Sequence, residues 1–247
     1  VIESLAANPG ITEALMNEIY QGHVEPQLEA LARNANLPLS IQKALSDENS
    51  AKVKAALAAN GAVDQMILRQ LLLDVSADVR IALLKNPLLD LSMQLKLAKD
   101  RDARVRSAVA MRRQISKSVQ TQLAVDPDKA VRMSLLSGEG ALLVEIQNTL
   151  ANDGEQSIRE LLAAQSVLAP SVQVLLAKDK MIGVRRALAK GGDDLCEEVQ
   201  LSLARDIDRG VRLALAESQC SSSAVQALLA QDADVVLRIR LIEMSSA

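Results

Sequence analysis

The segment Asp100–Val125, DRDARVRSAVAMRRQISKSVQTQLAV, carries a pattern that the chain follows almost from end to end. In it a hydrophobic residue is followed by a basic one, and such pairs recur about every 26 residues. The pairs are Val53-Lys54, Val79-Arg80, Val105-Arg106, Val131-Arg132, Ile158-Arg159, Val184-Arg185, Val211-Arg212 and Leu237-Arg238. Leu28 and Ile2 continue the series towards the N-terminus in a less regular form. Self-similarity at this period predicts stacked structural repeats, about ten in number.

Each repeat contains two short helical patterns. Val105, Ala108 and Val109 have the i, i+3, i+4 spacing of one helical face. A second apolar pattern follows roughly 14 residues later, as in Val119 with Leu123, Met93 with Leu97, and Val225 with Leu228 and Leu229. Two helices of roughly ten residues are too short to be stable alone in water, so neighbouring repeats must stabilise them. We therefore expect an all-α fold: an α-solenoid, wound as a right-handed superhelix of about ten 26-residue two-helix repeats. It should form a single domain over residues 1–247, with the first and last repeats incomplete.

An aspartate marks the start of most repeats. It precedes the hydrophobic residue by five positions in seven of them: Asp74, Asp100, Asp126, Asp153, Asp179, Asp206 and Asp232. An aspartate at a helix N-cap accepts a hydrogen bond from an unpaired backbone N–H and complements the helix dipole. In the stretch DPDKAVR we expect Asp126 at the N-cap and Pro127 at the first helical position. This interpretation is favoured over metal ligands or catalytic acids.

The basic residue of each pair allows two interpretations. A regular row of arginines could present an accessible anion-binding surface. Alternatively, each arginine could bind an aspartate of a neighbouring repeat through a bidentate ion pair, which would give an internal ladder. We favour the ladder because an aspartate stands at a constant distance from every arginine.

The segments DRDARVRSAVAMRRQISKSVQTQLAVDPDKAVR and DVSADVRIALLKNPLLDLSMQLKLAKD resemble bacterial leucine-rich repeat variant proteins, and more loosely the HEAT-like families. The resemblance rests on the D-x-x-x-x-V-R-x-A-L/V start, the Asn86-Pro87 and Asn8-Pro9 turns, and the L-x-x-L-A-x-D close. It implies an α-solenoid in which one α-helix alternates with a shorter, tighter helix. The repeats here are longer than is usual in that family, which suggests that the second helix is more nearly α. The cysteine-rich segment that binds an iron-sulfur cluster in one member of the family has no counterpart here.

Composition narrows the classes of protein. Phe and Trp are absent and Tyr20 is the only aromatic residue, whereas large enzyme pockets are usually lined with aromatic side chains. No run of about 18 uncharged apolar residues exists, so we expect no membrane span. Cys196 and Cys220 lack neighbouring ligands and are expected to be small core or surface thiols, which suits a reducing cytoplasm.

Charge is unevenly distributed along a chain whose net charge is −3. Residues 96–132 contain ten Lys and Arg against four Asp and Glu, and residues 173–192 contain five against one. Several of these cations fall on the helical face away from the valine stripe or in the adjoining turn, where they would line the concave surface. The candidate partner-binding residues are Lys85, Arg104, Arg112, Arg113, Arg186 and Lys190. They form either a solvated basic face or a groove for an acidic or phosphate-bearing ligand.

Other chemical signals are weak. His23 is the only histidine, so a multi-histidine metal cluster cannot form, and a Ser/His/Asp triad would need distant partners. The acidic run Asp193, Asp194, Glu197 and Glu198 suits a helix start better than a cation site. Gly138 and Gly140, like Gly191 and Gly192, lack the further glycines of phosphate-binding fingerprints and are expected in turns. We predict no catalytic residue, no metal and no cofactor.

The leading hypothesis for function is a non-enzymatic scaffold or adaptor that binds a protein partner, possibly an acidic one, along the concave groove. The alternative is a nucleic-acid-binding, HEAT-like solenoid that uses its basic bands. HEAT-like solenoids also include alkylpurine DNA glycosylases, but the aromatic residues that would stack a base are missing here. An enzyme or maturation factor is disfavoured because no catalytic constellation is visible. The sequence leaves the oligomeric state open.

Overall fold

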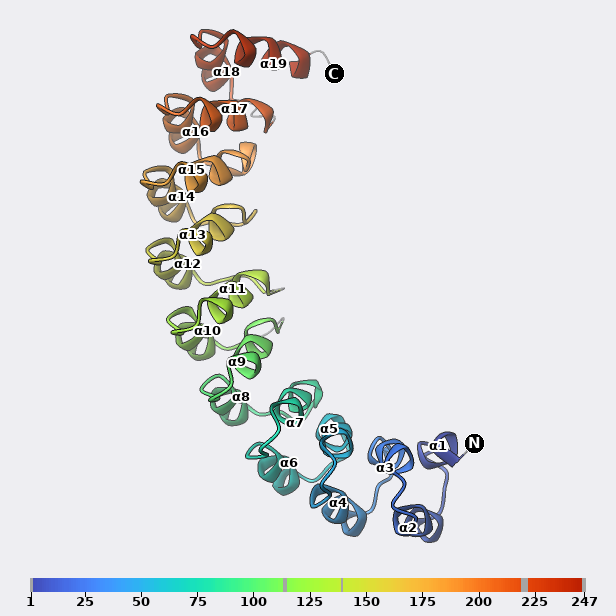
Figure 1. Ribbon diagram of the computed structural model, residues 1–247. Helices are drawn as coiled ribbons and strands as arrows, with labels where there is room; N and C mark the ends of the chain where they lie inside the picture. The colour runs from blue at the N-terminus through green and yellow to red at the C-terminus, as the bar shows by residue number, and fades with distance from the viewer. Residues whose placement is uncertain (1, 113–114, 139, 219–221, 246–247) are drawn as a thin grey trace. The chain divides into compact units, whose positions relative to one another are not determined.

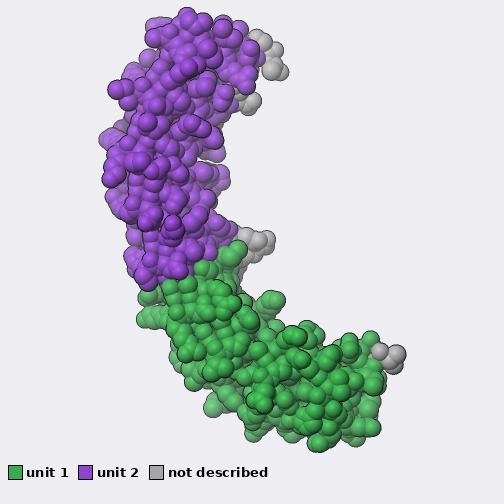
Figure 2. All heavy atoms as spheres, viewed as in Figure 1, with its two compact units in different colours: residues 1–123 green, residues 124–247 purple. Residues whose placement is uncertain are grey.

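The computed structural model describes residues 2–112, 115–138, 140–218 and 222–245. Regular structure in these ranges consists of α-helices and two short 3-10 segments, without a strand. The chain divides into two compact units, residues 1–123 and 124–247 (Figure 2). The single domain expected from the sequence stays a prediction.

Unit 1 contains two rows of helices that alternate along the chain (Figure 1). The odd-numbered row consists of α1 (Ile2–Ala6), α3 (Glu25–Ala32), α5 (Ala51–Ala59), α7 (Ala77–Ala82), extended by η1 (Leu83–Lys85), and α9 (Ala103–Ala110). The even-numbered row consists of α2 (Glu13–Gln21), α4 (Leu39–Ser46), α6 (Gln65–Leu71), α8 (Leu91–Leu97) and α10 (Lys117–Ala124), which ends at the boundary of the unit. Each helix of the odd-numbered row packs against the next helix of that row.

Unit 2 repeats this arrangement. Its odd-numbered row consists of α11 (Lys129–Ser137), α13 (Gln156–Ala163), α15 (Ile182–Ala189), α17 (Arg209–Glu217) and α19 (Val235–Ser245). Its even-numbered row consists of α12 (Val144–Ala151), α14 (Pro170–Ala177), α16 (Glu197–Ala204), preceded by η2 (Gly192–Asp194), and α18 (Ser223–Ala230). An odd-numbered helix inside the row, such as α15, therefore packs against the helices before and after it in its own row. It also packs against helices of the even-numbered row. The two helices of a repeat are both α, as the longer repeat suggested.

The core lies between the two rows and is built by the predicted hydrophobic positions. The hydrophobic member of each regular pair has no exposed surface: Val53, Val79, Val105, Val131, Ile158, Val184, Val211 and Leu237. The second apolar pattern is buried as well, at Met93, Leu97, Val119, Leu123, Val225 and Leu229. Leu228 is half-buried and Ile2, in the first helix, is 48% exposed. The repeat phase assigned from the sequence is thus confirmed in its regular part.

The predicted helix caps are wrong by two residues. The N-cap of α11 is Asp128, whose Oδ1 accepts from the backbone N–H of Ala130 at 2.8 Å, and Pro127 lies in the turn before it. Asp126 instead accepts from the backbone N–H of Asp128 at 2.9 Å. The other six aspartates make the same bond to the residue two positions on: Asp74, Asp100, Asp153, Asp179, Asp206 and Asp232. An aspartate readily closes such a turn, and here it leaves the rest of the carboxylate available to another repeat.

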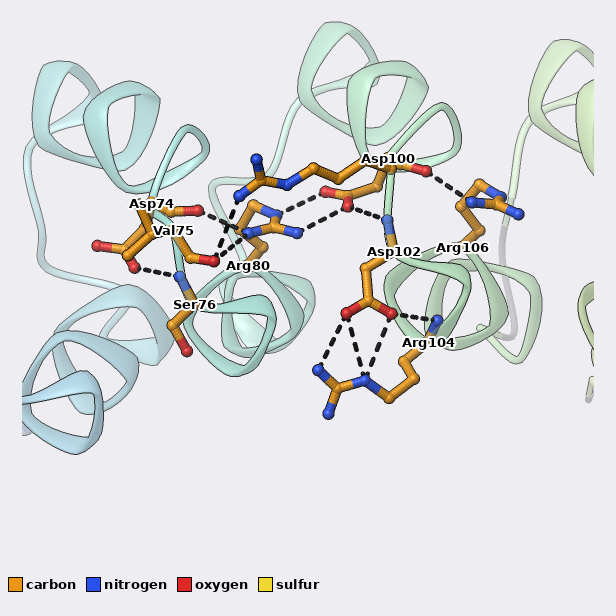
Figure 3. A network of polar contacts seen from close by, with 9 residues as sticks. Asp74, Val75, Ser76, Arg80, Asp100, Asp102, Arg104 and Arg106 are labelled. Atoms are coloured by element: carbon orange, nitrogen blue, oxygen red, sulfur yellow. Dashed lines mark hydrogen bonds and ion pairs between the residues drawn. The ribbon is translucent and has the colours of Figure 1, made fainter.

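The predicted Asp/Arg ladder is confirmed (Figure 3). Arg80 Nε and Nη2 donate to Asp100 Oδ2 and Oδ1 at 2.6 and 2.8 Å, in the bidentate geometry that favours arginine. Arg80 Nη1 also donates to the backbone carbonyl oxygen of Asp74 at 2.6 Å, so one guanidinium bonds two successive repeats. The same set of bonds is made by Arg132, Arg159, Arg185 and Arg212. These five arginine side chains are buried or nearly buried, so they do not form an accessible anion-binding row.

A second ladder, made of asparagines, joins the repeats of unit 1. Asn60 Nδ2 donates to the carbonyl oxygens of Ala32 and Asn34 at 2.9 and 2.8 Å, and its Oδ1 accepts from the backbone N–H of Ala62. The same pattern is made by Asn34 and Asn86. The Asn86-Pro87 turn noted in the sequence is therefore a step of this ladder, and in the Asn8-Pro9 turn the Asn8 carbonyl oxygen accepts from Asn34. The ladder satisfies carbonyl groups at the ends of the odd-numbered helices.

Glutamines connect the even-numbered helices. Gln173 Nε2 donates to the carbonyl oxygens of Leu168 and Asp194, and its Oε1 accepts from the backbone N–H of Cys196 at 2.8 Å. Gln42 and Gln147 make the equivalent bonds. Because these amides are buried, their hydrogen bonds also fix the register between repeats.

Replacement of Val184 by Asp should destabilise the protein strongly. Val184 lies in α15 between α13 and α17, so Val184→Asp would leave an unpaired charge in the core at a loss of roughly 3 to 5 kcal/mol. Leu237→Asp in α19, which has α17 and α18 as neighbours, should cost less. Urea unfolding of both variants measures the difference, and equal losses would contradict the assigned repeat phase.

Loss of one ladder arginine should also destabilise the protein. Arg159→Gln leaves Asp179 without its bidentate partner, and we expect a loss of roughly 3 kcal/mol in the free energy of unfolding. Arg186→Gln is the matched control, because Arg186 is exposed and has no ion pair in the described ranges; it should change stability by less than about 0.5 kcal/mol. Equal unfolding midpoints for the two variants would show that the ladder contributes nothing.

The ladder also predicts how stability depends on pH. Burial acts to raise the pKa of Asp179, but the hydrogen bonds from Arg159 and from the Met181 backbone hold this pKa below its ordinary value of 3.8. The same direction holds for Asp100, Asp206 and Asp232. Because the folded pKa is the lower one, the stabilisation is complete above the unfolded value and is lost as pH falls through the folded value. The melting temperature should therefore fall steeply below about pH 4, and Arg159→Gln should weaken that fall.

Candidate functional site

A groove crosses the odd-numbered row of unit 1, over α3, α5, α7 and η1. Its volume is about 620 Å³. Four alanines line it, Ala55, Ala56, Ala59 and Ala82. Glu29, Arg33, Lys52 and Lys85 also line it, together with Asn60 and Gly61. We call this surface the alanine groove.

The alanine groove arises from the composition of α5, whose sequence is AKVKAALAA. Val53, Leu57 and Ala58 are fully buried, whereas Ala55 and Ala59 are half-buried and line the groove together with Ala56. Alanine loses no side-chain entropy in a helix, so this face stays helical without large side chains. The result is a shallow surface on which a partner can approach the helix backbone closely.

The charges around the alanine groove are mostly positive. Arg33 pairs with Glu29 on the same helix, and Lys52 Nζ lies 3.8 Å from Glu25 Oε1. Both pairs are largely exposed, and exposed pairs contribute little energy. Lys85 has no carboxylate within ion-pair distance among the described residues. The groove thus offers one unpaired cation, Lys85, and two cations, Arg33 and Lys52, whose weak ion pairs a ligand can replace.

The predicted site residues of unit 1 do not form one patch. Lys85 lines the alanine groove, whereas Arg104 lies at the start of α9 in a separate, polar cleft. Arg104 Nη2 donates to Asp102 Oδ2 at 3.0 Å, and this hydrogen bond lowers the pKa of Asp102 (Figure 3). Arg112 follows α9 and is half-buried, and its Nη1 has no hydrogen-bond partner within the described residues.

The remaining predicted residues fall elsewhere. Arg186 and Lys190 are exposed on α15 and at its end, in unit 2. Arg113 lies outside the described residues. The proposal that these six cations bind a partner therefore stays a prediction.

The weaker sequence signals have structural explanations where they are described. His23 is exposed in the turn between α2 and α3, with φ of 46° and its Nδ1 3.7 Å from Glu48 Oε1. Asp193 and Asp194 lie in η2, and Gly192 before them has φ of 51° in the turn. Cys196 is the half-buried N-cap of α16, while Cys220 lies outside the described residues. The described part of the chain contains no group of three potential metal ligands.

Sequence reasoning missed Arg33 and Lys52. Arg33 belongs to a degenerate early repeat. Lys52 holds the same repeat position as Arg104, directly before the valine, but lies outside the two basic bands of the sequence. The available signal was the density of alanine in residues 55–59, which marks a helix face without large side chains.

Comparison with known proteins supports the fold. No protein-family model and no curated protein matches the sequence. A solved structure described as "a leucine-rich repeat variant with a novel repetitive protein structural motif" matches with a TM-score of 0.64 and 22% identity, over 94% of this chain and 96% of that chain. At this identity the likeness is one of fold. The chain therefore has the fold of a helical-repeat solenoid, similar to that of this leucine-rich repeat variant, as its sequence suggested.

Solenoids of this class generally present extended surfaces for interaction with other molecules. In the described ranges, none of the helices combines the length and the apolar character needed to cross a lipid bilayer.

Proposed function

We propose that the chain is a non-enzymatic scaffold that binds a protein partner along its odd-numbered row, with the alanine groove as the principal contact. The observation that carries the proposal is the make-up of this groove, in which four alanines are surrounded by Arg33, Lys52 and Lys85. Small side chains allow close approach of a partner segment, and the cations favour one that bears carboxylates.

The charges favour selection of an acidic partner. Lys85 can bind a carboxylate of the partner without first losing an ion pair within the described residues. The exposed ion pairs of Arg33 and Lys52 can be replaced at little cost in free energy. Opposite charge across an interface chiefly speeds association and excludes wrong partners. The other predicted basic residues, Arg104, Arg112, Arg113, Arg186 and Lys190, belong to the proposal as contacts beyond the groove.

The test begins with recovery of partners from the source cell by pull-down and mass spectrometry, followed by purification of the recovered partner. Lys52→Glu combined with Lys85→Glu should slow its association by about tenfold at low salt and reduce the salt dependence of the rate. Stopped-flow or surface-based kinetics at several salt concentrations measures both effects.

The matched control is Lys43→Glu combined with Arg69→Glu, which makes the same change of charge on the even-numbered helices α4 and α6. This control should leave the association rate nearly unchanged. If both double variants slow association equally, the effect arises from net charge alone, and the alanine groove is refuted as the contact. A labelled oligonucleotide whose affinity falls steeply with salt, whatever its sequence, would instead favour the nucleic-acid alternative.

A further inference from the structure

A second hollow in unit 1 lies where α6 and α8 end. It has a volume of about 740 Å³ and is lined by Leu72, Leu73, Asp74, Val75, Arg80, Ser92, Leu95, Lys96, Leu97, Lys99, Asp100 and Arg101. Two successive inter-repeat turns therefore form its walls. We call it the loop cleft; it shares no residue with the alanine groove.

One wall of the loop cleft is apolar and open to solvent. Leu73 and Val75 are 77% and 82% exposed. They occupy repeat positions that carry Lys99 and Arg101 in the next repeat. The two side chains are exposed together beside a hollow, and a contiguous exposed apolar patch is typical of interaction sites.

The opposite wall is cationic. Lys96, Lys99 and Arg101 are exposed, and none of them has an ion pair within the described residues. Arg101 Nη2 lies 3.4 Å from the carbonyl oxygen of Val75 and so reaches across from one turn to the other. The loop cleft thus holds three cations available to a ligand.

The two carboxylates of the loop cleft do not neutralise these cations. Asp74 pairs with Lys54. Asp100 receives the bidentate bonds of Arg80 (Figure 3). Both carboxylates are already part of the internal ladder. The unbalanced charge that faces the cleft is therefore positive.

We propose that the loop cleft docks a short acidic protein segment that inserts one or two large apolar side chains between Leu73, Val75 and Leu95. Its flanking Asp or Glu residues bind Lys96, Lys99 and Arg101. The volume lies within the range of sites that enclose small ligands, which suits one or two large side chains. This surface is independent of the alanine groove, so either proposal can fail without the other.

A second copy of this chain fits the loop cleft poorly. A symmetric dimer through the cleft would place the same cations opposite one another, because a two-fold interface uses the same surface twice. Nucleic acid also fits poorly, since it would leave the apolar wall in contact with phosphates. An acidic segment with apolar anchors satisfies both walls.

The test uses a phage-displayed library of random twelve-residue peptides, selected on the whole chain. We expect enrichment of peptides with one or two Leu, Ile, Met or Phe residues flanked by Asp or Glu. Synthetic peptides from the enriched pool should bind at least about tenfold more weakly to Lys99→Glu combined with Arg101→Glu, and to Leu73→Asp. Fluorescence anisotropy gives the dissociation constants, and circular dichroism verifies that these surface variants are folded.

Unit 2 offers matched controls at the same repeat positions. Lys178 and Lys180 correspond to Lys99 and Arg101, but the preceding turn there carries Asn152 and Gly154 instead of an apolar pair. Lys178→Glu combined with Lys180→Glu should change peptide affinity by less than about twofold. Ile207, which corresponds to Val75 and is 94% exposed, provides the apolar control Ile207→Asp.

Any of four outcomes would overturn the proposal. The first is that the enriched peptides lack the acidic and apolar pattern, and the second is that they bind the loop-cleft variants as well as the parent chain. The third is that the control variants of unit 2 weaken binding as much as the loop-cleft variants do. The fourth is a dimer, detected by sedimentation, that Leu73→Asp abolishes, because the cleft would then be covered by a second copy.

Discussion

The ion pair between an arginine and the aspartate of the next repeat is the interaction on which this fold depends most. Each aspartate does two things at once: it closes its own turn by accepting a backbone N–H, and it receives two N–H bonds from the preceding repeat. The arginine in turn bonds a backbone carbonyl of its own repeat. Local turn geometry and contact between repeats are therefore coupled in a single side-chain pair. Helices of five to eleven residues, which are unstable alone, gain a fixed register from it.

The asparagine and glutamine ladders extend the same principle to the helix ends. Asn60 and Gln173 each donate to two backbone carbonyls and accept one backbone N–H, so they use almost the whole capacity of a side-chain amide. Polar groups that would otherwise be unsatisfied at the helix ends are bonded within the stack. The solvent-facing side chains of both rows are therefore not needed to hold the repeats together, and they can vary without loss of the fold.

The division between structural and available cations follows from these ladders. Most arginines of the repeat pairs are buried beside carboxylates and present no charge to a ligand. Lys85, in the alanine groove, and Lys96, Lys99 and Arg101, in the loop cleft, have no such partner among the described residues. A chain of net negative charge can thus present locally positive surfaces. Function in such a solenoid depends on the few charges that the ladders leave over.

The sequence by itself determined the helical repeats, their phase and the Asp/Arg ladder, because periodicity records which residues face the core and which recur together. It placed the helix caps two residues early, since Asp126 and Asp128 are both good caps and only the backbone path decides between them. Only the tertiary structure decided which cations remain unpaired, because each partner lies some 20 residues away in the next repeat. It also brought Leu73 and Val75 opposite Lys99 and Arg101. Those residues are not neighbours in sequence, and a cleft between two turns exists only once the repeats are stacked.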